Sequence, residues 1–196
     1  MLMNNKLAIK DLVNVGLFSV LNVIFTFVGG MIGLIPVLMP AVPFVAACLA
    51  GPVNMLYTTR IRKRGMVFLQ CVLMGLVFMG TGHGPWIVGT FIVVGAIGEE
   101  ILKKGGYRSM KHARWCYSVI GIGTFGNFIP IMIARDAYLN DMVRQGMSKA
   151  YVEGFSKAMP QTIFVPSALM GAVGGYIGCT IGMHMLRKHF EKAGMV

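Results

Sequence analysis

Charged residues divide this chain into long apolar runs. Residues 12–59 carry no charge, and a second uncharged run covers residues 65–98. A membrane-crossing helix needs about 20 apolar residues, so each run has room for two such helices. Glycines and prolines, which interrupt helices, lie near the middle of both runs. The pattern therefore predicts two pairs of transmembrane helices in the first half of the chain.

Two more apolar segments follow, on either side of a polar stretch at residues 136–160. That stretch mixes charges with large apolar residues such as Val152 and Phe155, a pattern typical of an amphipathic helix at the membrane surface. We therefore expect an all-α integral membrane protein, a bundle of six transmembrane helices with an amphipathic surface helix between spans five and six. The expected spans, within a single transmembrane domain of residues 1–196, are residues 10–31, 38–58, 66–80, 86–103, 115–134 and 161–186.

The composition favours the same environment. Hydrophobic residues make up 56% of the 196 residues and charged residues only 13%, whereas soluble proteins have about 25% charged residues. The net charge of +11 comes from short basic clusters between the apolar runs. With both termini in the cytoplasm, 14 of the 18 Lys and Arg residues lie on cytoplasmic segments, as the positive-inside rule predicts. We thus expect the lipid bilayer as a partner, and no nucleic acid.

Motifs for ATP hydrolysis and for zinc-dependent hydrolysis are missing from the sequence, which contains neither G-x-x-x-x-G-K-[ST] nor H-E-x-x-H. The predicted spans are nearly free of ionisable residues, which ion-coupled transporters place near the bilayer centre. Glu99 and Glu100 are exceptions at the inner end of span four, where we expect i,i+4 pairs with Lys103 and Lys104. We therefore expect no enzyme, and predict no catalytic residue, metal site or cofactor in this chain.

Polar residues recur along one face of the first predicted span. Asn14, Asn22 and Thr26 are separated by multiples of four residues, which places them on one side of a helix. An amide in hydrocarbon needs a hydrogen-bonding partner. Either the stripe joins helices within the bundle, or Asn22 and Thr26 line a substrate cavity, and the pattern allows both interpretations.

A second group of unusual residues lies on the predicted outer side. A glycine-rich loop between spans three and four contains His83 and precedes Trp86, while Arg135, Asp136 and Tyr138 follow span five. Aromatic and His side chains can stack on a ligand, and an Arg can bind a carboxylate or phosphate. An aromatic belt and a surface ion pair are the alternative interpretation. Our substrate-binding candidates are Asn22, Thr26, His83, Trp86, Asn127, Arg135, Asp136 and Tyr138.

Four short motifs, spread in order along the chain, resemble those of one group of membrane proteins. They are Lys10-Asp11-Leu12-Val13-Asn14-Val15-Gly16, Thr81-Gly82-His83-Gly84, Arg135-Asp136-Ala137-Tyr138 and Lys188-His189-Phe190-Glu191-Lys192-Ala193-Gly194. With its size and six predicted spans, the chain resembles the substrate-binding (S) components of energy-coupling factor transporters. The similarity is greatest to the Trep_Strep or Mpt-type group of S components.

This resemblance implies a mechanism. S components of the bacterial plasma membrane bind a vitamin or another micronutrient from the outer side. They then dock on a transmembrane coupling protein that carries two cytoplasmic ATPases, and these partners use ATP. Small residues of the first span make the docking contact, which implies that role for Gly16, Ser19 and Val20. The resemblance also implies that residues 30–43 cover the substrate.

Two other functions are compatible with the same sequence. One is the uptake of haem or a metal chelate, with His83 and nearby methionines contacting the cargo. The other is a stand-alone membrane protein or enzyme of a different class, which would be isolated without ATPase partners.

Overall fold

The computed structural model describes residues 7–61 and 63–192, so Ala193 and Gly194 of the C-terminal motif lie outside the described residues. The structure is 86% helix, and the described residues form no strand. The long helices are α1 (Ile9–Gly30), α2 (Val42–Thr58), α3 (Met66–Phe78), α4 (Trp86–Lys104), α5 (Met110–Ile120) and α9 (Phe164–Met185). The short helices are α6 (Ile129–Ile133), α7 (Arg135–Arg144), α8 (Lys149–Ala158) and α10 (Arg187–Lys192).

Tighter or wider helical turns extend several of these helices. The 3-10 segments are η1 (Met31–Leu34), η2 (Pro36–Ala41), η4 (Gly121–Asn127) and η5 (Gln161–Ile163). The turn η3 (Met79–His83) is π-helical and continues α3. Among the described residues, four helical runs are long and apolar enough to cross a membrane: Ile9–Leu34, Pro36–Thr58, Met66–His83 and Gln161–Met185.

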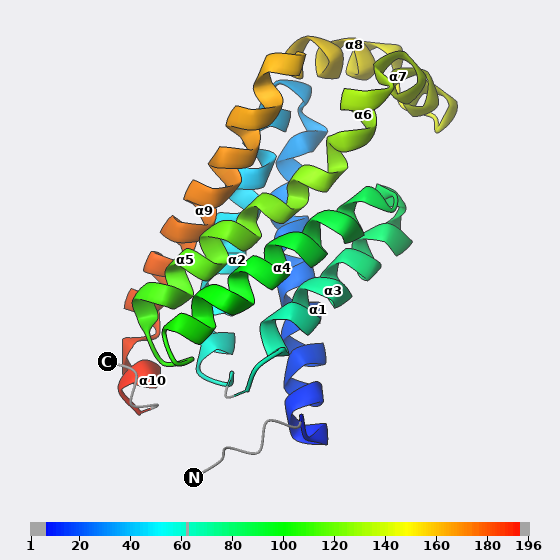
Figure 1. The fold of residues 1–196 in the computed structure, drawn as a ribbon. Coiled ribbons are helices and arrows are strands. Elements are labelled where there is room, and N and C mark those ends of the chain that lie inside the picture. Colours follow the sequence, from blue (N-terminus) through cyan, green and yellow to red (C-terminus); the bar gives the residue numbers. More distant parts are fainter. Residues whose placement is uncertain (1–6, 62, 193–196) are drawn as a thin grey trace.

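These four runs coincide, within a few residues, with the segments expected as spans one, two, three and six. Two further helical runs, α4 and the series α5–η4–α6, belong to the same bundle (Figure 1). Helix α4 carries two acidic and two basic residues near its C-terminal end, and α5 contains Lys111 and Arg114. These charges make both runs less apolar than the other four.

The outer surface of α9 shows why this bundle suits lipid. Its outward face is a row of exposed apolar side chains with no charge, while its inward face is a row of glycines. This arrangement is the reverse of a soluble helix, and lipid tails are the solvent for such a surface. The exposed row is Val165, Leu169, Val173, Ile177 and Ile181, and the inward glycines are Gly171, Gly174, Gly175, Gly178 and Gly182.

The fifth helical run differs from the expected continuous span at residues 115–134. It begins at Met110, because the Ser109 side chain accepts a hydrogen bond from the His112 N–H and caps α5. It then narrows into the 3-10 segment η4, where a side chain at Gly121 would overlap the backbone of Gly171 in α9. Helix packing in this region therefore depends on backbone contact.

Figure 1 shows that the two ends of the bundle are different. The start of α1, helix α10 and the turns α2–α3 and α4–α5 lie at one end, which we call the terminal end. Helices α7 and α8 cross the opposite end, and we call this pair the cap. The tip of the α3–α4 hairpin lies below the cap in this view.

The cap replaces the expected single amphipathic helix over residues 136–160. The chain turns between α7 and α8 at Gly146, whose φ of 91° favours glycine. The apolar face of the cap packs on the bundle rather than on lipid, and it forms a second hydrophobic core. This core contains Phe128, Ile131, Met142, Val152, Phe155, Met159 and Phe164.

At the terminal end, Glu99 is buried and does not make the pair that we expected with Lys103. Its carboxylate reaches from α4 to the first turn of α3, where backbone N–H groups have no partner within the helix. Every bond is 2.8–3.1 Å long, and the donors are the N–H groups of Gly65, Val67 and Phe68 and the Tyr107 hydroxyl.

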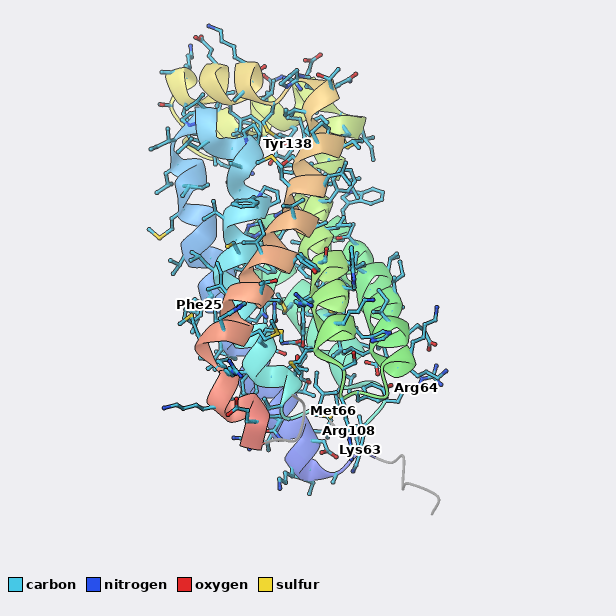
Figure 2. The ribbon with its side chains drawn as sticks, turned by 90° about the vertical axis from the view of Figure 1, so that its left-hand side faces the viewer. Phe25, Lys63, Arg64, Met66, Arg108 and Tyr138 are labelled. Carbon is cyan, nitrogen blue, oxygen red and sulfur yellow. The ribbon has the colours of Figure 1, made fainter. Side chains whose placement is uncertain are left out.

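Glu100 is exposed and pairs with Arg64 at 2.8 Å and Lys103 at 3.3 Å. The expected i,i+4 pairs of Glu99 and Glu100 are therefore wrong, because α3 and the turn before it approach this end of α4. Lys63 pairs with Asp11 of α1 at 2.7 Å. Figure 2 places Lys63, Arg64 and Arg108 together at this end, far from Tyr138 of the cap.

Candidate functional site

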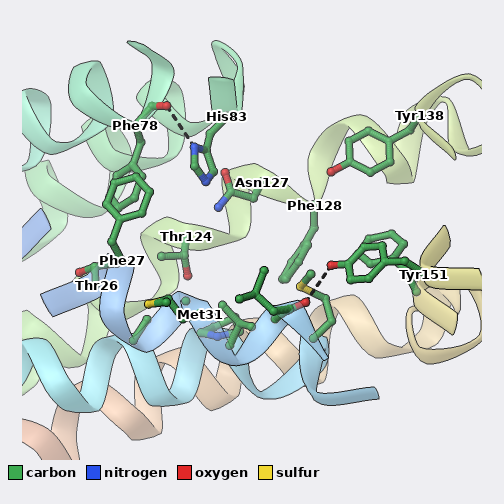
Figure 3. A pocket seen from close by; sticks show the side chains of 18 residues that line it. Thr26, Phe27, Met31, Phe78, His83, Thr124, Asn127, Phe128, Tyr138 and Tyr151 are labelled. Carbon is green, nitrogen blue, oxygen red and sulfur yellow. Dashed lines mark hydrogen bonds between the residues drawn. The ribbon is translucent and has the colours of Figure 1, made fainter. Parts of the chain in front are cut away.

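A cavity of about 480 Å³ lies between the bundle and the cap (Figure 3). Its walls come from the α1–η1–η2–α2 segment, the tip of the α3–α4 hairpin, η4 and the cap. The lining residues are Thr26, Phe27, Gly30, Met31, Gly33, Leu34, Met39, Val42, Pro43, Ala46, Phe78, His83, Thr124, Asn127, Phe128, Tyr138, Tyr151 and Phe155. The volume lies within the range of roughly 300–1,000 Å³ that is usual for small-molecule sites.

Four of the eight residues selected from the sequence line this cavity: Thr26, His83, Asn127 and Tyr138. They come from four different elements, α1, η3, η4 and α7. Several residues of the segment 30–43 also line the cavity. This is the segment that the resemblance implies as a cover over the substrate.

His83 has a defined orientation within η3. Its Nδ1 lies 3.2 Å from the Phe78 carbonyl oxygen and 3.1 Å from Thr81 Oγ1. Since Thr81 donates its own hydroxyl hydrogen to the Phe78 carbonyl, both oxygens act as acceptors and Nδ1 carries the hydrogen. Nε2 is then a hydrogen-bond acceptor in the neutral ring. The imidazole ring also makes T-shaped contacts with the rings of Phe27 and Phe78.

Asn127 supplies the second distinctive group of the cavity. It lies at the end of η4, directly after Gly126, where a side chain would overlap Thr90 and Ile87 of α4. The Oδ1 atom of Asn127 is buried and has no hydrogen-bond partner in the structure. A buried acceptor without a partner costs about 1–3 kcal/mol, so this atom is an exception that calls for a ligand or a water molecule.

Several lining residues did not stand out in the sequence. Tyr151 of α8 donates a hydrogen bond from its hydroxyl to the Gly33 carbonyl of η1 at 2.8 Å, which joins the cap to the opposite wall (Figure 3). Phe155 lies one helical turn away and also borders the cavity. The amphipathic pattern of this segment was visible, but the sequence could not show that its apolar face covers protein.

The cavity contains no charged side chain among its lining residues. His83, Tyr138 and Tyr151 are its titratable groups. Burial raises the pKa of the Tyr138 and Tyr151 hydroxyls above their ordinary range, so both phenols stay neutral at physiological pH. In the part of the chain that the structure describes, no three His, Cys, Asp or Glu side chains form a group that could hold a metal ion.

The other four candidates lie outside this cavity. Asn22 is buried one turn deeper, where it donates a hydrogen bond to Asn54 of α2 and lines a separate chamber of about 20 Å³, room for about one water molecule. Trp86 is 48% exposed at the start of α4 and borders an apolar groove on the outside of the bundle. Asp136 is exposed in the first turn of α7.

Arg135 holds the two helices of the cap together. Its guanidinium donates to the carbonyl oxygens of Met159 and Ser156, both at 2.7 Å, and to Ser156 Oγ at 3.1 Å. These acceptors lie at the C-terminal end of α8, where backbone carbonyls lack partners within the helix. The guanidinium thus stabilises the cap over the cavity.

Replacing Arg135 with Ala is expected to loosen α8. Three hydrogen bonds are lost and two carbonyl groups lose their donor, so the backbone amides of α8 should exchange hydrogen at least about tenfold faster. Hydrogen exchange with mass spectrometry checks this result. Arg144→Ala is the matched control, since Arg144 is exposed and contacts Asp141 on its own helix at 3.3 Å. Equal exchange in both variants would contradict this role.

The three residues implied in docking are neighbours on α1 but differ in exposure. Gly16 and Val20 are four residues apart on the outer side, and a side chain at Gly16 would meet open space. Ser19 is buried and donates its hydroxyl to the Val15 carbonyl at 2.7 Å. The outer face at this level of α1 therefore includes Gly16 and Val20, together with the exposed side chains of Val13 and Leu17.

A comparison with known proteins identifies the relatives of this chain. A family model described as a hypothetical bacterial integral membrane protein (Trep_Strep) matches residues 9–192, from the start of α1 to the end of α10. No curated protein and no solved structure matches the chain significantly.

Proposed function

Because this chain belongs to the Trep_Strep family of bacterial integral membrane proteins, we propose that it is the substrate-capturing S component of an energy-coupling factor importer. It is a multi-pass membrane protein, and the proposal adds that α4 and α5–α6 complete a set of six spans. Its substrate is a vitamin-like compound or another micronutrient, taken from the outer side of the membrane.

The observation that carries this proposal is the cavity beneath the cap. A cavity of about 480 Å³ with aromatic walls is of the size and character of small-molecule sites. It lies near one end of the bundle rather than along a continuous channel, which suits capture of a compound from one side. The cap and residues 30–43 form its outer walls.

The charge distribution supports the proposed orientation. Basic residues collect at the terminal end, where the positive-inside rule predicts the cytoplasm. In this orientation the cap end and the cavity face the outside of the cell. Figure 2 shows Lys63, Arg64 and Arg108 at the terminal end, which in this orientation would face the cytoplasmic ATPases.

The absence of a Walker motif from the sequence supports dependence on a partner for energy. The docking surface that we propose is the outer face of α1 around Gly16 and Val20. A small residue there lets a partner helix approach closely, as is common between helices in membranes.

Purification of the tagged protein from its native membranes tests this function. We expect a membrane coupling protein and two ATPases to be recovered with it. Gly16→Leu should reduce their recovery at least tenfold, because the new side chain projects from the proposed docking face. Gly89→Leu is the matched control, since Gly89 of α4 also faces open space. Recovery of the protein without ATPases, together with activity on a lipid, would instead support the stand-alone enzyme.

One observation favours the alternative cargo, haem or a metal chelate. Met31, Met39 and His83 all line the cavity, and Met and His are common axial ligands of haem iron. Haem also carries two propionate groups, and no Lys or Arg lines the cavity to pair with them. An absorption band of haem in the purified protein, lost in His83→Ala, would establish this alternative.

A further inference from the structure

We infer that the cavity selects a compound that is uncharged at neutral pH, contains a flat ring and donates a hydrogen bond to Asn127. This inference rests on the proposed function, because it names the chemical class of the captured substrate. It depends on three properties of the cavity walls: their charge, their unpaired acceptors and their aromatic rings.

The first property is the absence of charge from the walls. No Asp, Glu, Lys or Arg is among the lining residues, and burying an ion without a partner is strongly unfavourable. Arg135 lies nearby in the sequence, but its guanidinium is engaged with the carbonyl groups of α8. A carboxylate or phosphate in the cavity would therefore lack a cationic partner, and an ammonium group would lack an anionic one.

The second property is a pair of acceptors without a hydrogen donor. Asn127 Oδ1 is buried and unpaired, and the Nδ1–H of His83 is directed to its own turn, which makes Nε2 an acceptor. Figure 3 shows both side chains at the cavity. An N–H or O–H group of the bound compound would satisfy Asn127 after a rotation of its side chain that brings the buried Oδ1 to the cavity surface. Sites of this kind discriminate strongly, because an analogue without the donor leaves the buried acceptor unpaired.

The third property is the distribution of aromatic rings. Phe27 and Phe78 stack on each other at one end of the cavity, with ring centroids 5.1 Å apart. Phe128 and Tyr138 border the other end, and Figure 3 shows the Tyr138 hydroxyl directed toward the space between the two groups. Flat rings pack well against such side chains, and the flexible thioethers of Met31 and Met39 adapt to the rest of the compound.

The main experiment extracts small molecules from the full-length protein purified from its native host and identifies them by mass spectrometry. Wild-type protein should carry an enriched compound that is neutral at pH 7 and contains a ring and an N–H or O–H group. Asn127→Leu should carry at least tenfold less of it, while Asn140→Leu, the same change at an exposed site of the cap, should carry the wild-type amount. A tenfold loss corresponds to about 1.4 kcal/mol, which is within the cost of a buried acceptor left unpaired.

Stability separates a role in binding from a role in folding. Because Asn127 Oδ1 has no partner in the structure, Asn127→Leu should unfold at the same temperature as the wild type or higher when no compound is bound. An enriched compound with a carboxylate, phosphate or ammonium group would overturn the inference and leave the proposed function intact. A wild-type protein recovered with neither a bound compound nor ATPases would overturn both.

A matched pair of probes tests the charge preference directly. Indole-3-acetamide and indole-3-acetate share one ring system, and only the acetate is an anion at neutral pH. In calorimetric titration of the purified protein, the amide should bind at least tenfold more tightly, because the cavity walls carry no charge. Asn127→Leu should weaken binding of the amide and leave the acetate the weaker ligand. Equal binding, tighter binding of the acetate, or no binding of either probe would count against the inference.

Discussion

Replacing Glu99 with Gln is expected to lower the free energy of unfolding by about 3 kcal/mol or more, a large part of the usual stability of a domain. The Glu99 carboxylate acts as the acceptor in each of its hydrogen bonds, and three of the donors are backbone N–H groups at the start of α3. A hydrogen bond to a charged acceptor contributes about 1.5–3 kcal/mol. A Gln side chain would place an N–H₂ group against at least one of these donors and would remove the negative charge near the N-terminus of α3.

This effect is specific to the buried position. Gly65, the residue before α3, has a φ of 93° and provides no side-chain cap, so α4 supplies the acceptor from a distance of 34 residues along the chain. Glu100→Gln is the control, because Glu100 is half exposed and its partners Arg64 and Lys103 are also exposed. Exposed pairs of this kind contribute little. Equilibrium unfolding in detergent micelles measures both variants, and equal stability of the two would contradict the capping role of Glu99.

Gly178→Ala is expected to prevent correct assembly of α2 and α9. These two helices touch through their backbones: a side chain at Gly178 would overlap the Cys48 carbonyl, and one at Gly51 would overlap Gly178 itself. The obstructing atoms belong to the backbone, so no rotation of a side chain can relieve the overlap and the helices must separate. Overpacking costs about 1–3 kcal/mol in ordinary cores, and we expect at least the upper end here.

The measurement is the yield of monodisperse protein after extraction from the membrane, together with its melting temperature. Gly89→Ala is the control, since Gly89 lies inside α4 with open space beyond it. Ala favours a helix over Gly by up to about 1 kcal/mol, so this variant should be as stable as the wild type or slightly more stable. A Gly178→Ala protein with the same yield and melting temperature as Gly89→Ala would contradict this prediction. It would show that α2 and α9 can move apart without a loss of stability.

The membrane character of the chain could be predicted because it depends on the amino-acid composition of short segments, each about as long as one membrane-crossing helix. Spans one, two, three and six were expected within a few residues of the helical runs that the structure contains. The family was also recognisable from four motifs, as the match over residues 9–192 confirms. The link to energy-coupling factor importers, the count of six spans and their orientation remain predictions.

The candidate site was only partly predictable. His83 and Asn127 attracted attention as polar groups near the ends of apolar runs, and both line the cavity. Arg135 attracted attention as an anion-binding residue, yet its hydrogen bonds hold the cap together. The chemical type of Arg135 was visible in the sequence, whereas its hydrogen-bond acceptors come from Ser156 and Met159, more than 20 positions away.

The sequence by itself determined that this protein belongs in a lipid bilayer, and it determined the approximate limits of most of its helices. Both properties depend on residues that are near neighbours along one helix. Only the tertiary structure decided that residues 136–160 form a cap over a cavity, that Glu99 serves α3 and that Arg135 is engaged with carbonyl groups. These are contacts between distant segments, and their geometry depends on how closely the glycine faces allow the helices to pack.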